Sequence, residues 1–163
     1  CTVVGFPLGA MESNSKAFEA QTAIENGADE IDMVINIGYL KSKFYKGVLN
    51  DIKKVKKAPG TKVLKIILQT CDLTDEEIIK ACQLCVEAKA DFVKTSTGFS
   101  KSGAHLDAVK IMKETVKDKA KIKASGGIRD YETAKQFVDL GVHRLGVSAG
   151  IAIMNGETST SDY

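Results

Sequence analysis

Four charged residues interrupt segments of the sequence that are otherwise apolar: Asp32, Lys65, Lys94 and Lys123. Successive members are 33, 29 and 29 residues apart, so they occupy equivalent places in successive units of the chain. Because an unpaired charge is costly to bury, we expect the four side chains to meet in one polar site. The alternative is a single buried ion pair, with the remaining lysines reaching the surface along their apolar stems.

Lysines gathered in this way suggest carbonyl chemistry. A neutral lysine amine attacks a carbonyl to form a Schiff base, and the protonated imine then withdraws electrons from the neighbouring carbon. Free lysine has a pKa of about 10.4, which burial and a second nearby cation both lower. Lys94 and Lys123 on neighbouring strands would satisfy this requirement, and Asp32 beside them would transfer protons.

Small residues follow three of the predicted strands. Thr95-Ser96-Thr97-Gly98 comes after Lys94, Ser125-Gly126-Gly127 comes after Lys123, and residues 146–150 (GVSAG) end the last strand. Glycines let backbone N–H groups approach an anion, and a helix amino terminus adds partial positive charge. Each segment alone is equally typical of a tight turn. Together, at the same end of the strands as the lysines, they predict a phosphate pocket.

The elements that would position these residues alternate regularly. The sequence predicts strands over residues 2–6, 30–37, 62–69, 91–95, 121–124 and 143–147, several apolar nearly throughout, as in parallel sheets buried on both faces. Helices are predicted between them. One spans residues 74–89 with a capping box of Thr74 and Glu77, and one from Asp130 buries Ala134, Phe137 and Val138.

Another predicted helix carries an apolar stripe of Phe44, Val48, Ile52 and Val55 and ends at Pro59-Gly60. Alternating strands and helices leave two architectures, an open doubly wound sheet or a closed barrel. The chain lacks the G-x-G-x-x-G turn of the dinucleotide-binding fold, which favours the barrel.

Length and composition agree with one α/β domain over residues 1–163, with a polar tail at 155–163. A complete (β/α)₈ barrel needs at least about 200 residues. We therefore expect six βα units of a TIM barrel, with the first two lying ahead of Cys1. The net charge of +2 indicates neither nucleic acid nor an anionic membrane as a partner. Sparse cysteines and the lack of a long apolar run predict a cytoplasmic protein.

Cys82 and Cys85 have the spacing of half a metal or redox site, but they fall on the apolar face of the predicted helix 74–89. No second pair of cysteines and no nearby histidines accompany them. We expect both thiols to pack in the core and predict no metal and no other cofactor.

Several segments resemble one family of enzymes. EIDMVINIGYL (30–40), ADFVKTSTGF (90–99) and KIKASGGIR (121–129) are similar to the deoxyribose-phosphate aldolases, which are class I, Schiff-base-forming aldolases. TVVGFPLG (2–9), LKIIL (64–68) and RLGVSAG (144–150) agree in the same order. The resemblance implies reversible cleavage of 2-deoxy-D-ribose 5-phosphate to D-glyceraldehyde 3-phosphate and acetaldehyde, in deoxyribose phosphate catabolism and without a metal.

The resemblance also implies roles for individual residues. Lys94 would form the Schiff base, Lys123 would lower the pKa of Lys94, and Asp32 would relay protons with Lys123. The substrate and its phosphate would be bound by Lys65, Thr97, Gly98, Gly126, Gly127, Gly146 and Ser148. The partners implied are a sugar phosphate and an aldehyde, and the protein would be a homo-oligomer, either a dimer or a tetramer.

The sequence departs from the family's pattern at three positions. Gln69 stands where the family often has an acidic residue, which we expect to alter the pairing around Lys65. Val147 and Ala149 replace hydroxyl residues near the phosphate loops. Two other readings stay open, a phosphate-binding barrel isomerase whose lysines only stabilise charge and a non-catalytic barrel fragment. Tyr163 closes the tail, where we expect disorder rather than a proton donor.

Overall fold

The structure is a computed structural model that describes residues 1–58 and 62–160. In this part of the chain, six parallel strands form one sheet in sequence order. They are β1 (Thr2–Val4), β2 (Glu30–Val34), β3 (Val63–Ile67), β4 (Phe92–Lys94), β5 (Lys121–Ser125) and β6 (Arg144–Gly146). All six predicted strands are therefore present; five are shorter than their predicted ranges, and β5 is one residue longer.

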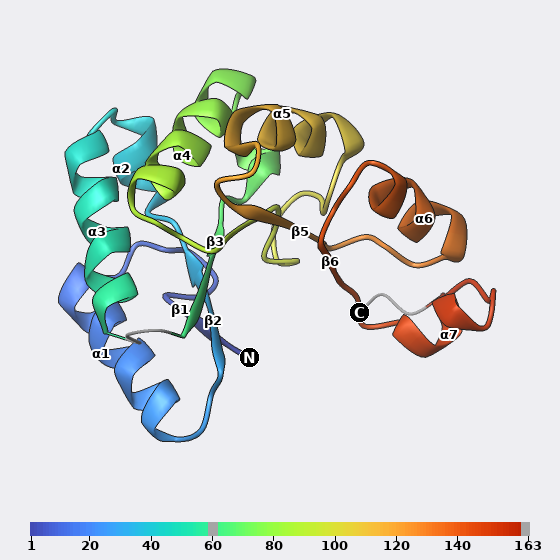
Figure 1. The fold of residues 1–163 in the computed structure, drawn as a ribbon, viewed down its shortest axis with the longest axis horizontal. Coiled ribbons are helices and arrows are strands. Elements are labelled where there is room, and N and C mark those ends of the chain that lie inside the picture. The colour runs from blue at the N-terminus through green and yellow to red at the C-terminus, as the bar shows by residue number, and fades with distance from the viewer. Residues whose placement is uncertain (59–61, 161–163) are drawn as a thin grey trace.

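Helices follow the strands and lie along the outside of the curled sheet, in an arc from α1 to α7 (Figure 1). They are α1 (Ser13–Glu25), α2 (Ile37–Lys41), α3 (Tyr45–Lys57), α4 (Asp75–Glu87), α5 (Leu106–Val116), α6 (Tyr131–Asp139) and α7 (Gly150–Met154), with a 3₁₀ turn η1 at Thr70–Asp72. The architecture is thus α/β with a curled parallel sheet, as predicted.

The two faces of the sheet differ sharply in chemistry. Outward side chains such as Ile31, Met33 and Ile66 pack against the helices in the main hydrophobic core. Side chains alternate between the faces of a strand, so Asp32 and Lys65 project to the inside of the curl. We expected several strands to be apolar nearly throughout and interrupted by four charged residues, and these charged side chains lie on the inner face.

Strand register places those charged residues at two successive levels of the sheet. Asp32 lies opposite Lys65 in the pairing of β2 with β3. Lys94 lies two residues further along the sheet than Lys65, and it is opposite Lys123 in the pairing of β4 with β5. Lys123 in turn lies opposite Arg144 of β6. Because residues two apart along a strand point to the same face, both levels lie on the inner face of the sheet.

The helix predictions hold with two corrections. The capping box of Thr74 and Glu77 is present at the start of α4, and Cys82 and Cys85 are both fully buried in the core. Val138, predicted to be buried, is 54% exposed, because Ala134 and Phe137 take the inward face of α6. Phe44 precedes α3 instead of joining its buried stripe and is also exposed.

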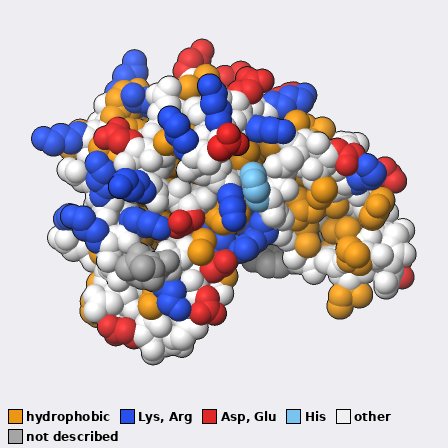
Figure 2. Space-filling model, viewed as in Figure 1, with side chains coloured by type: hydrophobic (Ala, Val, Ile, Leu, Met, Phe, Trp, Pro, Cys, Tyr) orange, Lys and Arg blue, Asp and Glu red, His pale blue; other side chains and the backbone are white. Residues whose placement is uncertain are grey.

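The surface has an uneven distribution of side chains. Basic residues are spread over the side built from α3 and α4, whereas apolar side chains gather over α6 and α7 (Figure 2). Ile151 and Met154 of α7 contribute the most exposed of these apolar side chains. Among the described residues, no helix is long and apolar enough to cross a membrane. Pro59-Gly60 and Tyr163 lie outside the described residues.

Candidate active site

The Asp32 carboxylate stands at the centre of the charged cluster. Its Oδ2 atom accepts hydrogen bonds from Lys94 Nζ at 2.7 Å and from Lys123 Nζ at 2.8 Å. Its Oδ1 atom accepts one from Lys65 Nζ at 2.8 Å. Asp32 is almost fully buried, so the pairing with three ammonium groups is what makes a carboxylate tolerable there. The structure thus brings the four residues together, as the sequence predicted.

Lys65 lies deeper than the other lysines. Its side chain is 0% exposed and contacts Glu30 Oε2 at 2.7 Å in addition to Asp32. Lys65 is not among the residues that line the cavity described below. Its expected role in binding substrate stays a prediction.

The surroundings of Lys94 favour its neutral form. Burial lowers the pKa of Lys94, and the charges of Lys123 and Lys65 lower it further, although the hydrogen bond to Asp32 opposes these effects. Burial alone would raise the pKa of Asp32, but the hydrogen bonds from Lys123, Lys65 and Lys94 outweigh it and lower that pKa. Asp32 is therefore ionised at neutral pH, beside an amine that loses its proton more easily than a free lysine.

Lys94 also lines a cavity of about 630 Å³ at this end of the sheet. Its walls come from the segments that follow β4, β5 and β6. Six of the predicted binding residues line it: Thr97, Gly98, Gly126, Gly127, Gly146 and Ser148. Asp32 and Lys123 do not line the cavity and lie behind the Lys94 amine. The predicted phosphate loops and Lys94 thus border one cavity.

Backbone geometry explains why glycine occupies two positions in these loops. Gly126 has a φ of +86°, which side chains rarely adopt. Gly103 approaches it so closely that a Cβ on Gly103 would lie 2.1 Å from the Gly126 carbonyl oxygen. The Ala104 N–H donates to that same oxygen at 3.0 Å. The segment after β4 is therefore fastened to the segment after β5 along the cavity wall.

Gln69 has a different role from the one we expected. It was predicted to affect the pairing of Lys65, yet its Oε1 atom accepts a hydrogen bond from the Thr97 N–H at 2.8 Å. Gln69 is buried and has a φ of +59°, an uncommon conformation for a residue with a side chain. The amide therefore holds the start of the loop after β4.

Four residues of the site escaped the sequence analysis. Arg129 and Phe99 line the cavity, and both stand inside the motifs KIKASGGIR and ADFVKTSTGF, so the motifs could have indicated them. Glu30 and Arg144 form an ion pair within the curl of the sheet. Their separation of 114 residues gave no signal in the sequence.

The tail of the chain also returns to this region. The Ser159 N–H donates to the Arg129 carbonyl oxygen at 2.9 Å, next to the cavity wall. Among the described residues, no group of histidine, cysteine and carboxylate side chains has the arrangement to hold a metal ion. What the arrangement offers is a nucleophilic amine, a buried carboxylate with a second amine, and a cavity edged by glycine loops.

Known proteins resemble this chain over nearly its whole length. A family model described as "DeoC/LacD family aldolase" matches residues 2–156. A deoxyribose-phosphate aldolase of Finegoldia magna is 62% identical over 156 residues, which is 96% of this chain and 73% of that protein. The chain thus spans about three quarters of that relative's length.

Solved structures give the same picture. An aldolase designated QR15 superposes with a TM-score of 0.90 at 44% identity, over 94% of this chain and 69% of that one. A deoxyribose-phosphate aldolase from Aeropyrum pernix, described as a unique tetrameric structure, superposes with a TM-score of 0.83 at 31% identity. It is matched over 94% of this chain and 65% of its own.

Proposed function

Because the chain belongs to the DeoC/LacD family of aldolases, we propose that it cleaves 2-deoxy-D-ribose 5-phosphate reversibly to D-glyceraldehyde 3-phosphate and acetaldehyde. The observation that carries this proposal is the position of Lys94. Its amine lies at the wall of the cavity and shares Asp32 Oδ2 with Lys123. A carbon–carbon lyase that works through an imine needs an amine in this setting.

The reaction begins when the neutral Lys94 amine attacks the C1 aldehyde of the open-chain sugar. Loss of water then gives an imine, which carries a positive charge once protonated. Burial and the charge of Lys123 favour the neutral amine before the attack. Lys123 and Asp32 stand at hydrogen-bond distance from each other and donate and accept the protons of these steps.

Cleavage follows from the electron demand of the imine. A base takes the proton of the C3 hydroxyl, the C2–C3 bond breaks, and its electron pair moves to C2 and the imine to form an enamine. D-Glyceraldehyde 3-phosphate leaves at this point. Protonation of C2 gives the acetaldehyde imine, and water releases acetaldehyde and restores the Lys94 amine. Each step can run in reverse, so the same residues would serve synthesis.

The phosphate group is proposed to lie against the loops after β5 and β6. Gly126, Gly127 and Gly146 offer backbone N–H groups there, and Ser148 adds a hydroxyl. Thr97 and Gly98 form the opposite wall. Arg129 is the one arginine among the lining residues, and its guanidinium group is suited to pair with a phosphate.

Three broader features are proposed on the same basis. The six strands would correspond to six of the eight strands of a (β/α)₈ barrel, which the superposition on longer aldolases supports. Assembly as a homo-oligomer is supported by the tetramer described for the Aeropyrum pernix protein. A role in deoxyribose phosphate catabolism, in the cytoplasm, follows from the proposed substrate.

The test is an assay of acetaldehyde release from 2-deoxy-D-ribose 5-phosphate by the full-length protein. We expect turnover, and we expect Lys94→Met to abolish it. Lys101→Met is the matched control, because Lys101 lies on the same loop but is exposed and pairs with Asp72. Turnover by the Lys94 variant, or none by the folded parent, would contradict the proposal.

A further inference from the structure

The Lys65 ammonium group lies between two carboxylates. It donates hydrogen bonds to Asp32 Oδ1 at 2.8 Å and to Cys1 Sγ at 3.3 Å, and it forms an ion pair with Glu30 Oε2 at 2.7 Å. The fully buried Lys65 is therefore a link between Asp32 and Glu30.

Glu30 is the second of those carboxylates. It is the first residue of β2, two positions before Asp32, so both side chains project to the same face. Glu30 also pairs with Arg144 of β6, whose guanidinium carbon lies 5.2 Å from the centre of the Phe92 ring. Strands β2 and β6 are not neighbours in the sheet, so this pair crosses the inside of the curl.

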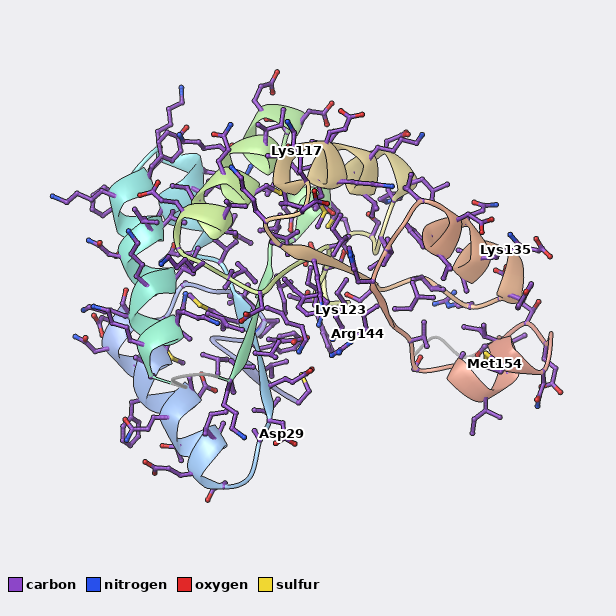
Figure 3. The ribbon with its side chains drawn as sticks, viewed as in Figure 1. Asp29, Lys117, Lys123, Lys135, Arg144 and Met154 are labelled. Carbon is purple, nitrogen blue, oxygen red and sulfur yellow. The ribbon has the colours of Figure 1, made fainter. Side chains whose placement is uncertain are left out.

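These contacts join into one chain of charges. It runs from Arg144 through Glu30, Lys65 and Asp32 to the amines of Lys94 and Lys123. Figure 3 shows Arg144 beside Lys123, to which it lies opposite in register. The chain holds four cations and two carboxylates. Glu30 therefore supplies one of the two negative charges that offset the positive charges around the Lys94 amine.

We propose that Glu30 is a positioning residue for the Lys94 amine, acting through Lys65 to keep Asp32 Oδ2 between Lys94 and Lys123. Glu30 holds one side of the Lys65 ammonium group, so Asp32 need commit only its Oδ1 atom to that lysine. The Oδ2 atom is then left for the two amines at the cavity. This proposal rests on the proposed aldolase function only where its test measures turnover.

Removing the negative charge of Glu30 is expected to lower the pKa of Lys94. Lys94 is faced by Asp32 of β2, Lys65 of β3 and Lys123 of β5, and Glu30 is faced by Lys65 and Arg144. Lys121 of β5 lies over the Phe92 ring and carries a further positive charge nearby. Without Glu30, Lys65 attracts Asp32 alone and repels Lys94 more strongly, so the Lys94 amine loses its proton at lower pH.

The experiment compares full-length parent and Glu30→Gln by two measurements. The first is the pH dependence of Lys94 acetylation by trace acetic anhydride, read by peptide mass spectrometry, which needs no turnover. The second is the pH profile of kcat/KM. We expect the labelling curve and the acidic limb to move to lower pH, and kcat to fall about tenfold because the amine is displaced.

The matched control is Asp29→Asn. Asp29 precedes Glu30 in sequence and carries the same charge, but it pairs with Lys62 and its side chain is 84% exposed. Figure 3 shows it well away from Lys123 and Arg144. We expect this variant to keep both the labelling curve and the acidic limb of the parent. An equal shift in the two variants would overturn the proposal, because a general charge effect would explain it.

A purely structural brace predicts a lower melting temperature for Glu30→Gln with both pH curves unmoved, and that result would also overturn the proposal. If Glu30→Gln does not fold, Glu30→Asp replaces it. This variant keeps the charge but shortens its reach by one methylene, and we expect a smaller shift of the labelling curve in the same direction. Absence of that shift contradicts the proposal. Lys94 labelling remains informative even when the parent shows no aldolase turnover, so failure of the two proposals can be told apart.

Discussion

At the scale of single residues, Asp32 makes the site possible. Three lysine ammonium groups surround its carboxylate at 2.7 to 2.8 Å, and each of the three depends on it for compensation. Lysine and aspartate are usually found on surfaces, and their burial together here reflects mutual neutralisation. Asp32 therefore contributes both to the chemistry of the site and to the stability of the fold.

Asp32→Asn tests this double role. Because the variant leaves three buried cations without their shared carboxylate, we expect the free energy of unfolding at pH 7 to fall by about 3–5 kcal/mol. The pKa of Asp32 is lowered below its ordinary value of 3.8, so its stabilising contribution is complete above that pH and is lost as the pH falls below it. Urea unfolding of the parent and the variant from pH 2 to pH 7 measures both effects.

We expect the variant's stability to decline less steeply than the parent's in acid. Asp29→Asn, which removes an exposed carboxylate paired with Lys62, serves as the control and should retain the parent's pH dependence. Parallel curves for parent and Asp32→Asn would show that the carboxylate contributes nothing to acid stability.

The sequence predicted part of this residue-level picture. Asp32, Lys65, Lys94 and Lys123 were detectable because charges stand out in apolar strands and recur at equal spacing. Glu30 was not, because an acidic residue at the start of a strand is typical of a surface position. Its importance depends on Arg144, a partner that only the folding of the sheet brings near. The depth of Lys65 was likewise invisible, since a lysine's sequence context does not state which way its amine is directed.

At the scale of elements, the loops that follow the strands form the walls of the cavity, and each loop begins where its strand ends. The close contact of Gly103 with Gly126 fastens the loop after β4 to the loop after β5. The glycine-rich segments were recognised in the sequence by composition. Their contact was not, because the backbone approach depends on conformations that neither segment specifies alone.

Gly103→Ala tests the role of this contact. The new Cβ would lie 2.1 Å from the Gly126 carbonyl oxygen, and because backbone atoms cannot yield cheaply, one of the two loops must move. We expect KM for the sugar phosphate to rise about tenfold, with a smaller effect on kcat, because the displaced loop lines the proposed phosphate site. Steady-state kinetics with 2-deoxy-D-ribose 5-phosphate measures the change.

Gly38→Ala is the comparison variant. Gly38 lies in α2, where the added Cβ would meet nothing closer than Asn36 Oδ1 at 3.4 Å. Its kinetic constants should match those of the parent. An unchanged KM in Gly103→Ala would mean that the two loops do not depend on each other to bind the substrate.

At the scale of the whole molecule, buried ion pairs occur on both sides of the sheet. Besides the charges inside the curl, Lys16 of α1 pairs with Asp51 of α3 at 2.7 Å, and both are buried. Lys16 Nζ also donates to the carbonyl oxygen of Val34 at the end of β2. Two helices and the strand that carries Asp32 are thereby joined at one point, away from the cavity.

Asp51→Asn is expected to destabilise the protein by about 3 kcal/mol at neutral pH, because it leaves the Lys16 charge buried without a partner. Burial already lowers the pKa of Lys16, although Asp51 opposes this, and the variant should lower it further. The unfolded state then binds more protons than the folded state, so the variant's stability should rise as the pH approaches 10.5. Thermal unfolding between pH 7 and pH 10 measures this.

The control is Glu87→Gln, which removes an exposed and longer ion pair with Lys53 and should leave stability close to the parent's. If the loss of stability caused by Asp51→Asn does not become smaller as the pH rises, then it does not come from the buried charge of Lys16. This pair could not be predicted from the sequence, because Lys16 and Asp51 lie in polar segments of helices that look solvent-facing.

The overall architecture was the most predictable feature. Strands and helices alternate at nearly constant spacing, and a parallel sheet with helices outside is the arrangement that such a pattern allows. The periodicity of the sequence does not indicate the curl of the sheet, which brings side chains of its inner face close to one another. Only that curl lets Arg144 of β6 reach Glu30 of β2 across the interior.

The Schiff base proposed for the Lys94 amine is the central step of the proposed reaction. Reduction with sodium borohydride in the presence of acetaldehyde, followed by peptide mass spectrometry of the full-length protein, tests this directly. We predict one ethyl group on Lys94, with Lys65 and Lys123 unmodified. An ethyl group on Lys123 in its place, or none on the folded protein, would contradict the account.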